Sequence, residues 1–359
     1  MNLKESYNKS FIEDLAIRIK NQFSDFNQDE FISSILNNGI DEKELKERMR
    51  LITQTLNEFL PFSFPKQIEV LKTVAPHFGG IQGFVFSDFV ETFGIDDFKV
   101  SIRALEVFTQ YSTAEFAIRP FFLKYPEQTL QQMITWSQHH NYHVRRLSSE
   151  GARPKLPWSF PLKMFITDPI PVIPILENLK NDESEYVRKS VANHLNDISK
   201  THPHLVLELA QKWYGKTNQT NRVVKHGLRT LLKEGDKKAL AIFNFDDTSN
   251  LSINGLNLLQ NKITIGDDLL FEFDVLNDSI NSRNVRLEYK IDYVKSNGSL
   301  SSKVFHITEL ELKKSQNKKF KKKQSFKNMT TRKHYPGKHF ISILANGEVK
   351  AKKEFTLQS

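Results

Sequence analysis

The sequence predicts a chain of two parts, an α-solenoid of paired helices followed by an all-β sandwich. Before residue 245, apolar residues recur at positions i, i+3 and i+4, the spacing that puts them on one face of a helix. After residue 245, apolar and polar residues alternate in short segments separated by turn signals, as in half-buried strands. We therefore expect a helical domain over residues 1–245 and a β-sandwich over residues 255–359, joined through "FNFDDTSNLSINGLN".

The helical part begins with amphipathic segments and continues with repeats. The segments "IEDLAIRIKNQF", "ELKERMRLITQTLNEFL", "FPKQIEVLKTVAPHF" and "LVLELAQKWYG" carry an apolar stripe, and Pro, Gly and Asp stand at their ends. Three further segments share a polar turn, a Val-Arg pair or near match, and a helix: "NYHVRRLSSEG", "DESEYVRKSVANHLNDIS" and "NQTNRVVKHGLRTLLKEG", preceded by a fainter copy, "STAEFAIRPFF". Their arginines, Arg145, Arg188 and Arg222, are separated by roughly the 34 to 47 residues of paired-helix repeats.

These repeats predict a basic groove. In a helical solenoid the second helix of each repeat lines the inner surface, so the Val would pack inward and the Arg would face the concavity or cap a neighbouring turn. A concave basic surface suits the phosphate backbone of duplex DNA. Alternatively, each Arg is structural and pairs with an acid of the next repeat. The candidate DNA-binding residues are Arg145, Arg188, Lys189, His194, Arg222, Lys225, His226 and Arg229.

The β part is predicted from alternating segments in chain order. They are "KITIGDDLLFEFDVLND", "NVRLEYKIDYVKSNG", "SKVFHITEL" and "KHFISILANGEVKAKKEFTLQ", and "SNGS" and "ANGE" are typical of the turns between strands. Several short strands over about 110 residues favour a β-sandwich.

A lysine-rich run lies inside this β part. Residues 312–333 contain ten Lys or Arg and no acid, and residues 245–359 carry +7 of the chain's net charge of +9. We expect a long loop or β-ribbon that contacts DNA phosphates outside the groove. The alternatives are a solvated loop or protection of an edge strand. The candidate residues are Lys318, Lys319, Lys321, Lys322 and Lys323.

Composition narrows the class of protein. The net charge of +9 over 359 residues favours a polyanionic partner, although a protein can be basic simply for solubility. With no cysteine, thiolate chemistry and disulfides are excluded. We see no apolar run long enough for a membrane span, no signal-peptide core and no P-loop, GxSxG or HExxH motif, and the histidines of "HHNYH" lack metal-ligand spacing. We therefore expect no metal or other cofactor and no membrane binding. We further expect a cytoplasmic monomer that is associated with the nucleoid when it binds DNA.

One segment, "HVRRLSSEGARPKLPW", combines an acid with several cations. Its first part is predicted to be helical, which puts Glu150 on the same face as Arg146, four residues earlier. Gly151 would let the chain leave the helix, and two prolines would stiffen the exit that ends at Trp158. Nearby cations keep Glu150 charged, and a fixed anion weakens phosphate binding. Glu150 could therefore stabilise a cation that forms during a reaction, or it could simply form an i, i+4 ion pair with Arg146.

These residues carry a resemblance to a known family. With "HVRRLSSEGARPKLPW" and "DESEYVRKSVANHLNDISK", most of residues 1–245 resembles the AlkC family of DNA glycosylases, relatives of AlkD. The tail, with "HYPGKHFISILANGE", is similar to the immunoglobulin-like domain that some members carry. The resemblance implies an α-solenoid of HEAT-like helical repeats followed by an immunoglobulin-like β-sandwich. It also implies a bacterial repair enzyme that removes 3-methyladenine and 3-methylcytosine from duplex DNA.

The resemblance also implies a catalytic role for carboxylates. Glu150 matches the family's catalytic acid, and Glu115 and Asp197 match acids that line the same pocket. A cationic methylated base leaves without protonation, so a carboxylate need only stabilise the oxocarbenium-like sugar and orient water. Alternatively, Asp197 caps a helix or pairs between repeats, and Glu115 is a buried partner of Arg119.

Three further residues acquire roles through the resemblance. Trp158 matches an aromatic residue that contacts the substrate nucleotide, and Arg153 and Arg146 would hold phosphates beside the lesion. No lysine is clearly placed for a Schiff base, so we expect a monofunctional glycosylase without a lyase step. The alternative function is a non-catalytic helical-repeat scaffold that binds DNA or an acidic protein.

Overall fold

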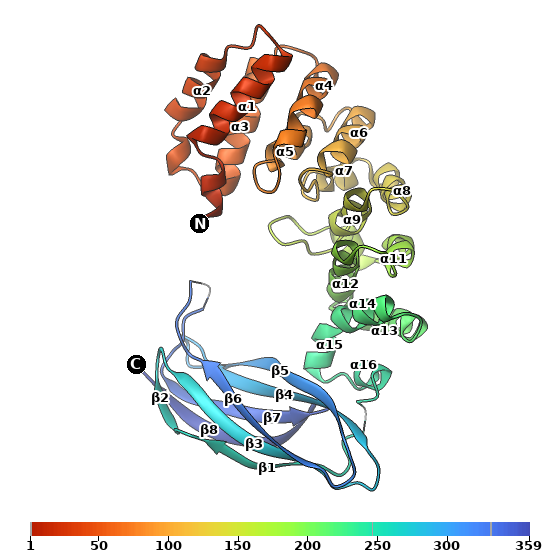
Figure 1. Ribbon diagram of the computed structural model, residues 1–359, viewed down its shortest axis with the longest axis vertical. Helices are drawn as coiled ribbons and strands as arrows, with labels where there is room; N and C mark the ends of the chain where they lie inside the picture. The colour runs from red at the N-terminus through yellow and green to blue at the C-terminus, as the bar shows by residue number, and fades with distance from the viewer. Residues whose placement is uncertain (1, 246, 331) are drawn as a thin grey trace. The chain divides into compact units, whose positions relative to one another are not determined.

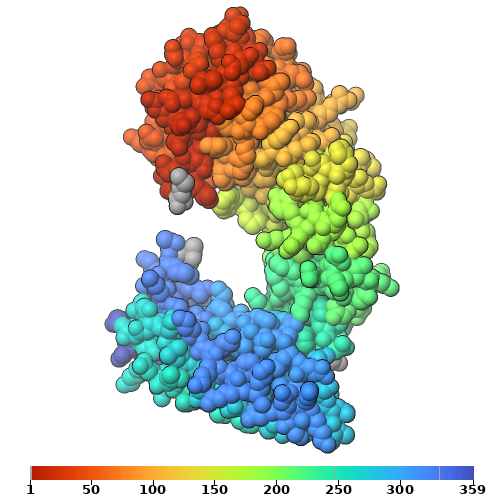
Figure 2. All heavy atoms as spheres, viewed as in Figure 1, coloured from red at the N-terminus to blue at the C-terminus, as the bar shows by residue number. Residues whose placement is uncertain are grey.

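The computed structural model describes residues 2–245, 247–330 and 332–359. Helices extend as far as Ile242 and strands begin at Leu251 (Figure 1). In Figure 2 the helical part is coloured red to green and the β part cyan to blue. The predicted α-solenoid followed by a β-sandwich is therefore confirmed. None of the helices in the described ranges is long and apolar enough to cross a membrane.

The chain divides into two compact units that do not follow its order. One unit contains residues up to 201 together with 215–227, and the other contains residues 202–214 and 228–359. The last helices before the strands thus pack with the β-sandwich. The proposed domain ranges, 1–245 and 255–359, remain a prediction.

The first unit is built from helices that pack on other helices close to them in the sequence. They are α1 (Lys9–Gln22), α2 (Gln28–Asn37), α3 (Leu45–Phe59), α4 (Phe64–Val74), α5 (Phe84–Phe93), α6 (Phe98–Phe108), α7 (Arg119–Lys124), α8 (Pro126–Trp136), α9 (Tyr142–Gly151), α10 (Lys163–Thr167), α11 (Ile173–Leu179), α12 (Glu185–Ser199) and α14 (Asn218–Gly227). Short 3-10 turns lie at Leu3–Ser6, Ile40–Glu42, Ala75–His77 and Ile170–Val172. Helix α9 packs on α8, α11 and α12, and α12 packs on α14. This is the contact pattern of paired-helix repeats.

The repeat register predicted from the sequence is confirmed by burial. Val144, Val187 and Val223, the valines of the Val-Arg pairs, are 0%, 0% and 2% exposed. Gly151 has a different role from the one expected: it is the last residue of α9, with Ala152 as the C-cap, but its φ is not positive. A Cβ at Gly151 would lie 2.5 Å from Ile118 Cγ2 and 2.9 Å from Met133 Cε. Close packing of α9, and not a turn out of the helix, therefore requires glycine here.

The second unit contains helices and two β-sheets. Its helices are α13 (Pro203–Trp213), α15 (Arg229–Glu234) and α16 (Lys237–Ile242), and its strands are β1 (Leu251–Leu258), β2 (Lys262–Thr264), β3 (Asp268–Asn277), β4 (Arg283–Val294), β5 (Leu300–Leu312), β6 (Asn317–Ser325), β7 (Gly337–Ala345) and β8 (Glu348–Gln358). Among the described residues, one sheet has the order β1-β3-β6 and the other β2-β8-β7-β4-β5. Among the described strand pairs, β2 and β8 are parallel and the other pairs are antiparallel.

The two sheets enclose one apolar core. Alternate residues of β3, among them Phe271 and Phe273, pack with Ile291 of β4 and Ile341 of β7, and each of these four is at most 1% exposed. The period-2 alternation seen in the sequence therefore marks the inward face of each sheet. The α15–α16 turn packs against the β7–β8 turn, where a Cβ on Gly347 would come within 2.9 Å of Gly235 Cα. Both glycines have positive φ, 79° and 74°.

Candidate functional site

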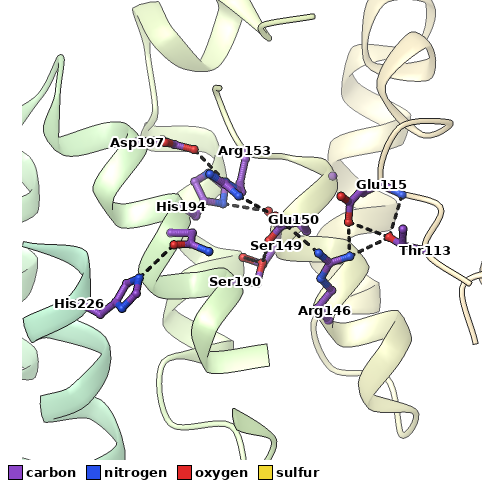
Figure 3. A network of polar contacts seen from close by, with 12 residues as sticks. Thr113, Glu115, Arg146, Ser149, Glu150, Arg153, Ser190, His194, Asp197 and His226 are labelled. Carbon is purple, nitrogen blue, oxygen red and sulfur yellow. Dashed lines mark hydrogen bonds and ion pairs between the residues drawn. The ribbon is translucent and has the colours of Figure 1, made fainter. Parts of the chain in front are cut away.

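Three acidic side chains from separate segments meet around two arginines. Glu115 precedes α7, Glu150 lies in the last turn of α9, and Asp197 lies near the end of α12 (Figure 3). Arg153 Nη1 lies 2.6 Å from Glu150 Oε1, and Arg153 Nε lies 2.8 Å from Asp197 Oδ2. Arg146 forms an ion pair with Glu115 and lies 3.5 Å from Glu150 Oε1. The predicted catalytic acids are therefore brought together.

Glu150 is fixed from both sides by helices α9 and α12. Its Oε1 faces the two arginines, while its Oε2 accepts a hydrogen bond of 2.6 Å from the Ser190 hydroxyl. Ser190 also lies 3.0 Å from the Ser149 hydroxyl, so two small side chains meet where α9 and α12 pack. The residue as a whole is only 5% exposed. Sequence reasoning missed Ser190, although its place two residues after Arg188 in the repeat could have marked it as facing α9.

Burial shapes the charges of this cluster. Burial alone would lower the pKa of Arg146 and Arg153, but the neighbouring carboxylates, Glu150 foremost, raise the pKa of both overall. Both guanidinium groups therefore remain charged, and together they balance two of the three carboxylate charges. His194 lies beside the cluster, where burial, reinforced by the charge of Arg153, lowers its pKa to about 3. An uncharged His194 thus adds no further cation.

The contacts decide between several alternatives that the sequence left open. Glu115 is paired with Arg146, so the alternative interpretation, in which Arg119 is its partner, is wrong. Arg119 instead donates to backbone carbonyls. Asp197 lies inside α12 and pairs with Arg153 and, at 3.1 Å, with Lys200, so it joins segments of successive repeats and does not cap a helix.

The same contacts favour a supporting role for the two arginines. The side chains of Arg146 and Arg153 are 13% and 8% exposed, and each is bound to two carboxylates. Arg146 also lies over the ring of Tyr186, 4.8 Å from its centroid. We expected both to hold phosphates, but this geometry suits the positioning of acids better. Phosphate contact remains a proposal for the exposed edge of Arg146.

Trp158 is presented on the loop between α9 and α10, which projects from the helices in Figure 1. Its side chain is exposed, and its φ of 65° is unusual for a bulky residue. Backbone strain of this kind is often stored at functional sites. The carbonyl of Trp158 accepts a hydrogen bond from Lys46 of α3.

A pocket of about 370 Å³ lies beside this indole. It is lined by side chains of both charges and by aromatic rings: Lys46, Met49, Arg50, Asp88, Glu91, Phe116, Trp158, Ser159 and Phe160. Arg50 Nη2 lies 2.7 Å from Asp88 Oδ1, and burial raises the pKa of Asp88. Sequence reasoning missed Lys46 and Arg50. The cations of "KELKERMR" are no more numerous than on an ordinary solvated helix face, so nothing in the sequence marked these two residues as part of a site.

The predicted basic groove is present in part on α12 and α14. One pocket of about 210 Å³ is lined by four basic side chains, those of Arg188, Lys189, Arg222 and His226. Lys225, the residue before His226, is exposed. Arg188 donates through Nη1 to the carbonyls of Asp182 and Glu183, at 2.6 and 2.9 Å. His226 Nε2 lies 3.1 Å from Asn193 Oδ1. Arg229 belongs to α15, in the other compact unit.

Two predicted DNA-binding residues have other positions. His194 is 0% exposed and its Nδ1 lies 3.0 Å from the Ser149 carbonyl, so the expectation that it faces DNA is wrong. Six residues separate it from Arg188, which turns it about 240° around the helix. Arg145 binds Asp182 through Nε at 2.6 Å and Nη2 at 3.0 Å, while its Nη1 donates to two further carbonyls. Arg145 is therefore the structural, repeat-joining arginine that was the alternative interpretation.

The central part of the lysine-rich run, Asn317–Ser325, forms β6 at one edge of the β1-β3-β6 sheet. Lys319 and Lys321 lie 3.2 and 3.5 Å from Glu272, and Lys323 lies 2.8 Å from Asp268. All five lysines from 318 to 323, termed the β6 lysines below, are exposed. The five lysines thus lie on a strand paired with β3, as in the β-ribbon alternative, and both phosphate binding and edge protection suit their position.

Comparisons with known proteins cover the whole chain. The family described as "DNA alkylation repair enzyme" matches residues 102–231, and "Uncharacterised protein YhaZ, C-terminal Ig-like domain" matches residues 252–359. The uncharacterized protein YhaZ of Bacillus subtilis (strain 168) is 47% identical over 354 residues, 99% of both chains. The structure of the Pseudomonas fluorescens alkylpurine DNA glycosylase AlkC, bound to DNA containing an abasic site analog, matches with a TM-score of 0.97 and 37% identity over 100% of both chains. The expected immunoglobulin-like character of the β part is confirmed.

Proposed function

This chain belongs to the AlkC-type family of DNA alkylation repair proteins with a C-terminal immunoglobulin-like domain, and on that premise we propose that it is a monofunctional DNA glycosylase. Its substrates would be cationic alkylated bases, 3-methyladenine and 3-methylcytosine, in duplex DNA. The observation that carries this proposal is the convergence of Glu115, Glu150 and Asp197 on one site. Ion pairs that only join repeats need one acid for each arginine, whereas here three acids share two arginines.

The proposed reaction needs a carboxylate and no general acid. When the C1′–N bond of a cationic base breaks, the base keeps the electron pair and becomes neutral. The positive charge then passes to the sugar, where a fixed carboxylate can stabilise it. Water adds to C1′ and loses a proton to the carboxylate or to solvent. We assign this role to Glu150, because its orientation is set by Arg146, Arg153 and Ser190.

The other residues of the cluster would act through Glu150 or on the DNA. Arg146 and Arg153 hold the three acids at their mutual positions, since each bridges two of them. We propose that Glu115 and Asp197 add negative potential at the sugar, and that Trp158 contacts the nucleotide next to the site with its exposed ring. Arg153 would keep its role in the site even if it touches no phosphate.

The duplex would be bound through its phosphates. Arg188, Lys189, Arg222, Lys225 and His226 on α12 and α14, Arg229 on α15, and the β6 lysines are the proposed contacts. Such contacts fix position without reading sequence. We further propose that the protein acts as a monomer, in the cytoplasm and on the nucleoid.

Excision from defined duplexes tests the proposal. Purified protein is incubated with one duplex that carries a single 3-methylcytosine and with another that carries a neutral ethenoadenine. We expect strand cleavage only after alkali, which breaks abasic sites, and only with the cationic lesion. Cleavage without alkali would indicate a lyase step. Binding of both duplexes without any alkali-labile site would favour the scaffold.

A further inference from the structure

Arg119 is a fully buried cation that the proposed chemistry does not use. It is 0% exposed and is the first residue of α7, four residues after Glu115. Its guanidinium makes four hydrogen bonds to three backbone carbonyls. Nη1 donates to Gly151 O at 3.0 Å and to Arg153 O at 2.7 Å, while Nε and Nη2 donate to Phe160 O at 3.2 and 2.6 Å.

These three carbonyls belong to the two ends of one loop. Gly151 and Arg153 lie where α9 ends, and Phe160 lies two residues after Trp158. A single planar group thus bridges the start and the finish of the loop that presents the indole. The Leu162 amide, which donates to Pro154 O at 3.0 Å, closes the same loop a little further along.

The bridge has consequences for both functional parts of the site. On one side, the backbone of Arg153 is fixed, and its guanidinium holds Glu150 and Asp197. On the other side, the loop closure sets where Trp158 stands. Arg119 also stacks on Phe160, with its guanidinium carbon 5.5 Å from the ring centroid.

The burial of the Arg119 guanidinium costs free energy that its contacts must offset. Burying a guanidinium is expensive, and an apolar side chain of similar volume often packs at lower free energy. Burial, with repulsion from Arg153, lowers the pKa of Arg119 to about 10, which still leaves it charged at neutral pH. An apolar side chain could not bind the carbonyls at both ends of the loop, because only the rigid, forked guanidinium of arginine donates hydrogen bonds in both directions.

We propose that Arg119 is a positioning residue: by closing the base of the loop it fixes Arg153, with the acids that Arg153 holds, and Trp158 at one mutual geometry. The proposal rests on the proposed glycosylase function for its effect on rate. Its effect on the loop does not depend on that function.

The test compares two buried arginines. Arg119→Lys keeps the charge but not the fork, and Arg119→Met removes both. Arg48→Lys is the matched control, because Arg48 is 2% exposed and also donates to backbone carbonyls, those of Lys43, Lys4, Tyr7 and Asp41, away from the acid cluster. All variants are assayed at a temperature where circular dichroism shows them folded.

Two readouts separate positioning from general stability. We expect the single-turnover excision rate at saturating enzyme to fall about 10- to 100-fold in both Arg119 variants, with affinity for undamaged duplex kept within about threefold. The second readout is the anisotropy decay of the tryptophan fluorescence that iodide can quench, which reports Trp158, because Trp136 and Trp213 are 1% and 2% exposed. Fast local motion should increase in the Arg119 variants only.

The positioning role of Arg119 can be contradicted in three ways. Unchanged rate and anisotropy in the Arg119 variants would overturn the proposal, as would equal losses in Arg48→Lys. If neither Arg119 variant folds, the residue is a global stabiliser and the proposal is wrong. If the wild-type protein excises no base, the proposed function fails, and the anisotropy readout still decides whether Arg119 holds the loop.

Discussion

Replacing Glu150 by glutamine removes one charge at the centre of the site and little else. In the wild-type protein Oε1 lies 2.6 Å from Arg153 and 3.5 Å from Arg146, and Oε2 accepts from Ser190 at 2.6 Å. The glutamine carbonyl can keep the bond from Arg153, and its amide can donate to Ser190. Arg153 keeps Asp197 and Arg146 keeps Glu115, so neither guanidinium is left alone.

The size of the effect follows from these contacts. The hydrogen bonds that glutamine keeps lose the charge of the carboxylate, which costs stability on the order of 1 kcal/mol. The excision rate should fall by about 10² or more, as when one preorganised electrostatic group is removed, which corresponds to about 2.7 kcal/mol of transition-state stabilisation. DNA binding should be kept or improved, because an anion has been removed from a basic surface.

The assay is single-turnover excision of 3-methylcytosine, run next to a matched control. Asp182→Asn weakens the other buried carboxylate–arginine pair of α9, with Arg145, since the Asp182 side chain is 5% exposed. The control should lose stability and keep its excision rate. Excision by Glu150→Gln within about threefold of wild type would remove Glu150 from the proposed catalytic role.

Three further predictions concern binding and stability. Changing the β6 lysines together to glutamine should make the slope of log K against log salt shallower by about two to five units, equally on damaged and undamaged DNA; an unchanged slope would leave edge protection as their role. Arg145→Ala should destabilise the fold by about 3 kcal/mol or more, because Asp182 is left as a buried charge, and it should leave the salt slope of DNA binding unchanged. Arg222→Ala should instead make that slope shallower by about one unit, with little loss of stability. Stability should fall as pH falls below about 6.5: the folded-state pKa of His194 is lowered to about 3, so protons bind first to the unfolded chain. Between pH 7.5 and 5.5 this amounts to about 1.4 kcal/mol, and urea denaturation of His194→Gln should show a correspondingly weaker pH dependence.

The elements were predictable from the sequence because they depend on local periodicity. The valines at 144, 187 and 223 mark the buried face of each repeat, and the alternation in "LLFEFDVLN" marks the inward face of β3. The Glu150–Arg146 contact also follows from i, i+4 spacing. Placing Glu115 and Asp197 beside Glu150 required the family resemblance, since the three acids come from different helical segments and no local rule joins them.

Other features depend on tertiary packing, and sequence reasoning missed them for that reason. His194 was grouped with Arg188 although six residues turn it to another face of the helix. Gly151 looked like a helix terminator, yet its role is the close approach of Ile118 and Met133 to α9. Arg119 looked like a partner for Glu115 at i+4, but its side chain turns instead to carbonyls beyond residue 150.

Release of free methylated base is the measurement that tests the glycosylase assignment most directly. Purified protein is incubated with methylated duplex DNA, and mass spectrometry identifies the small molecules set free, with Glu150→Gln in parallel. We predict free 3-methyladenine and 3-methylcytosine from the wild-type protein, intact strands until alkali is added, and about a hundredfold slower release by the variant. DNA that is bound but yields no free base would contradict it.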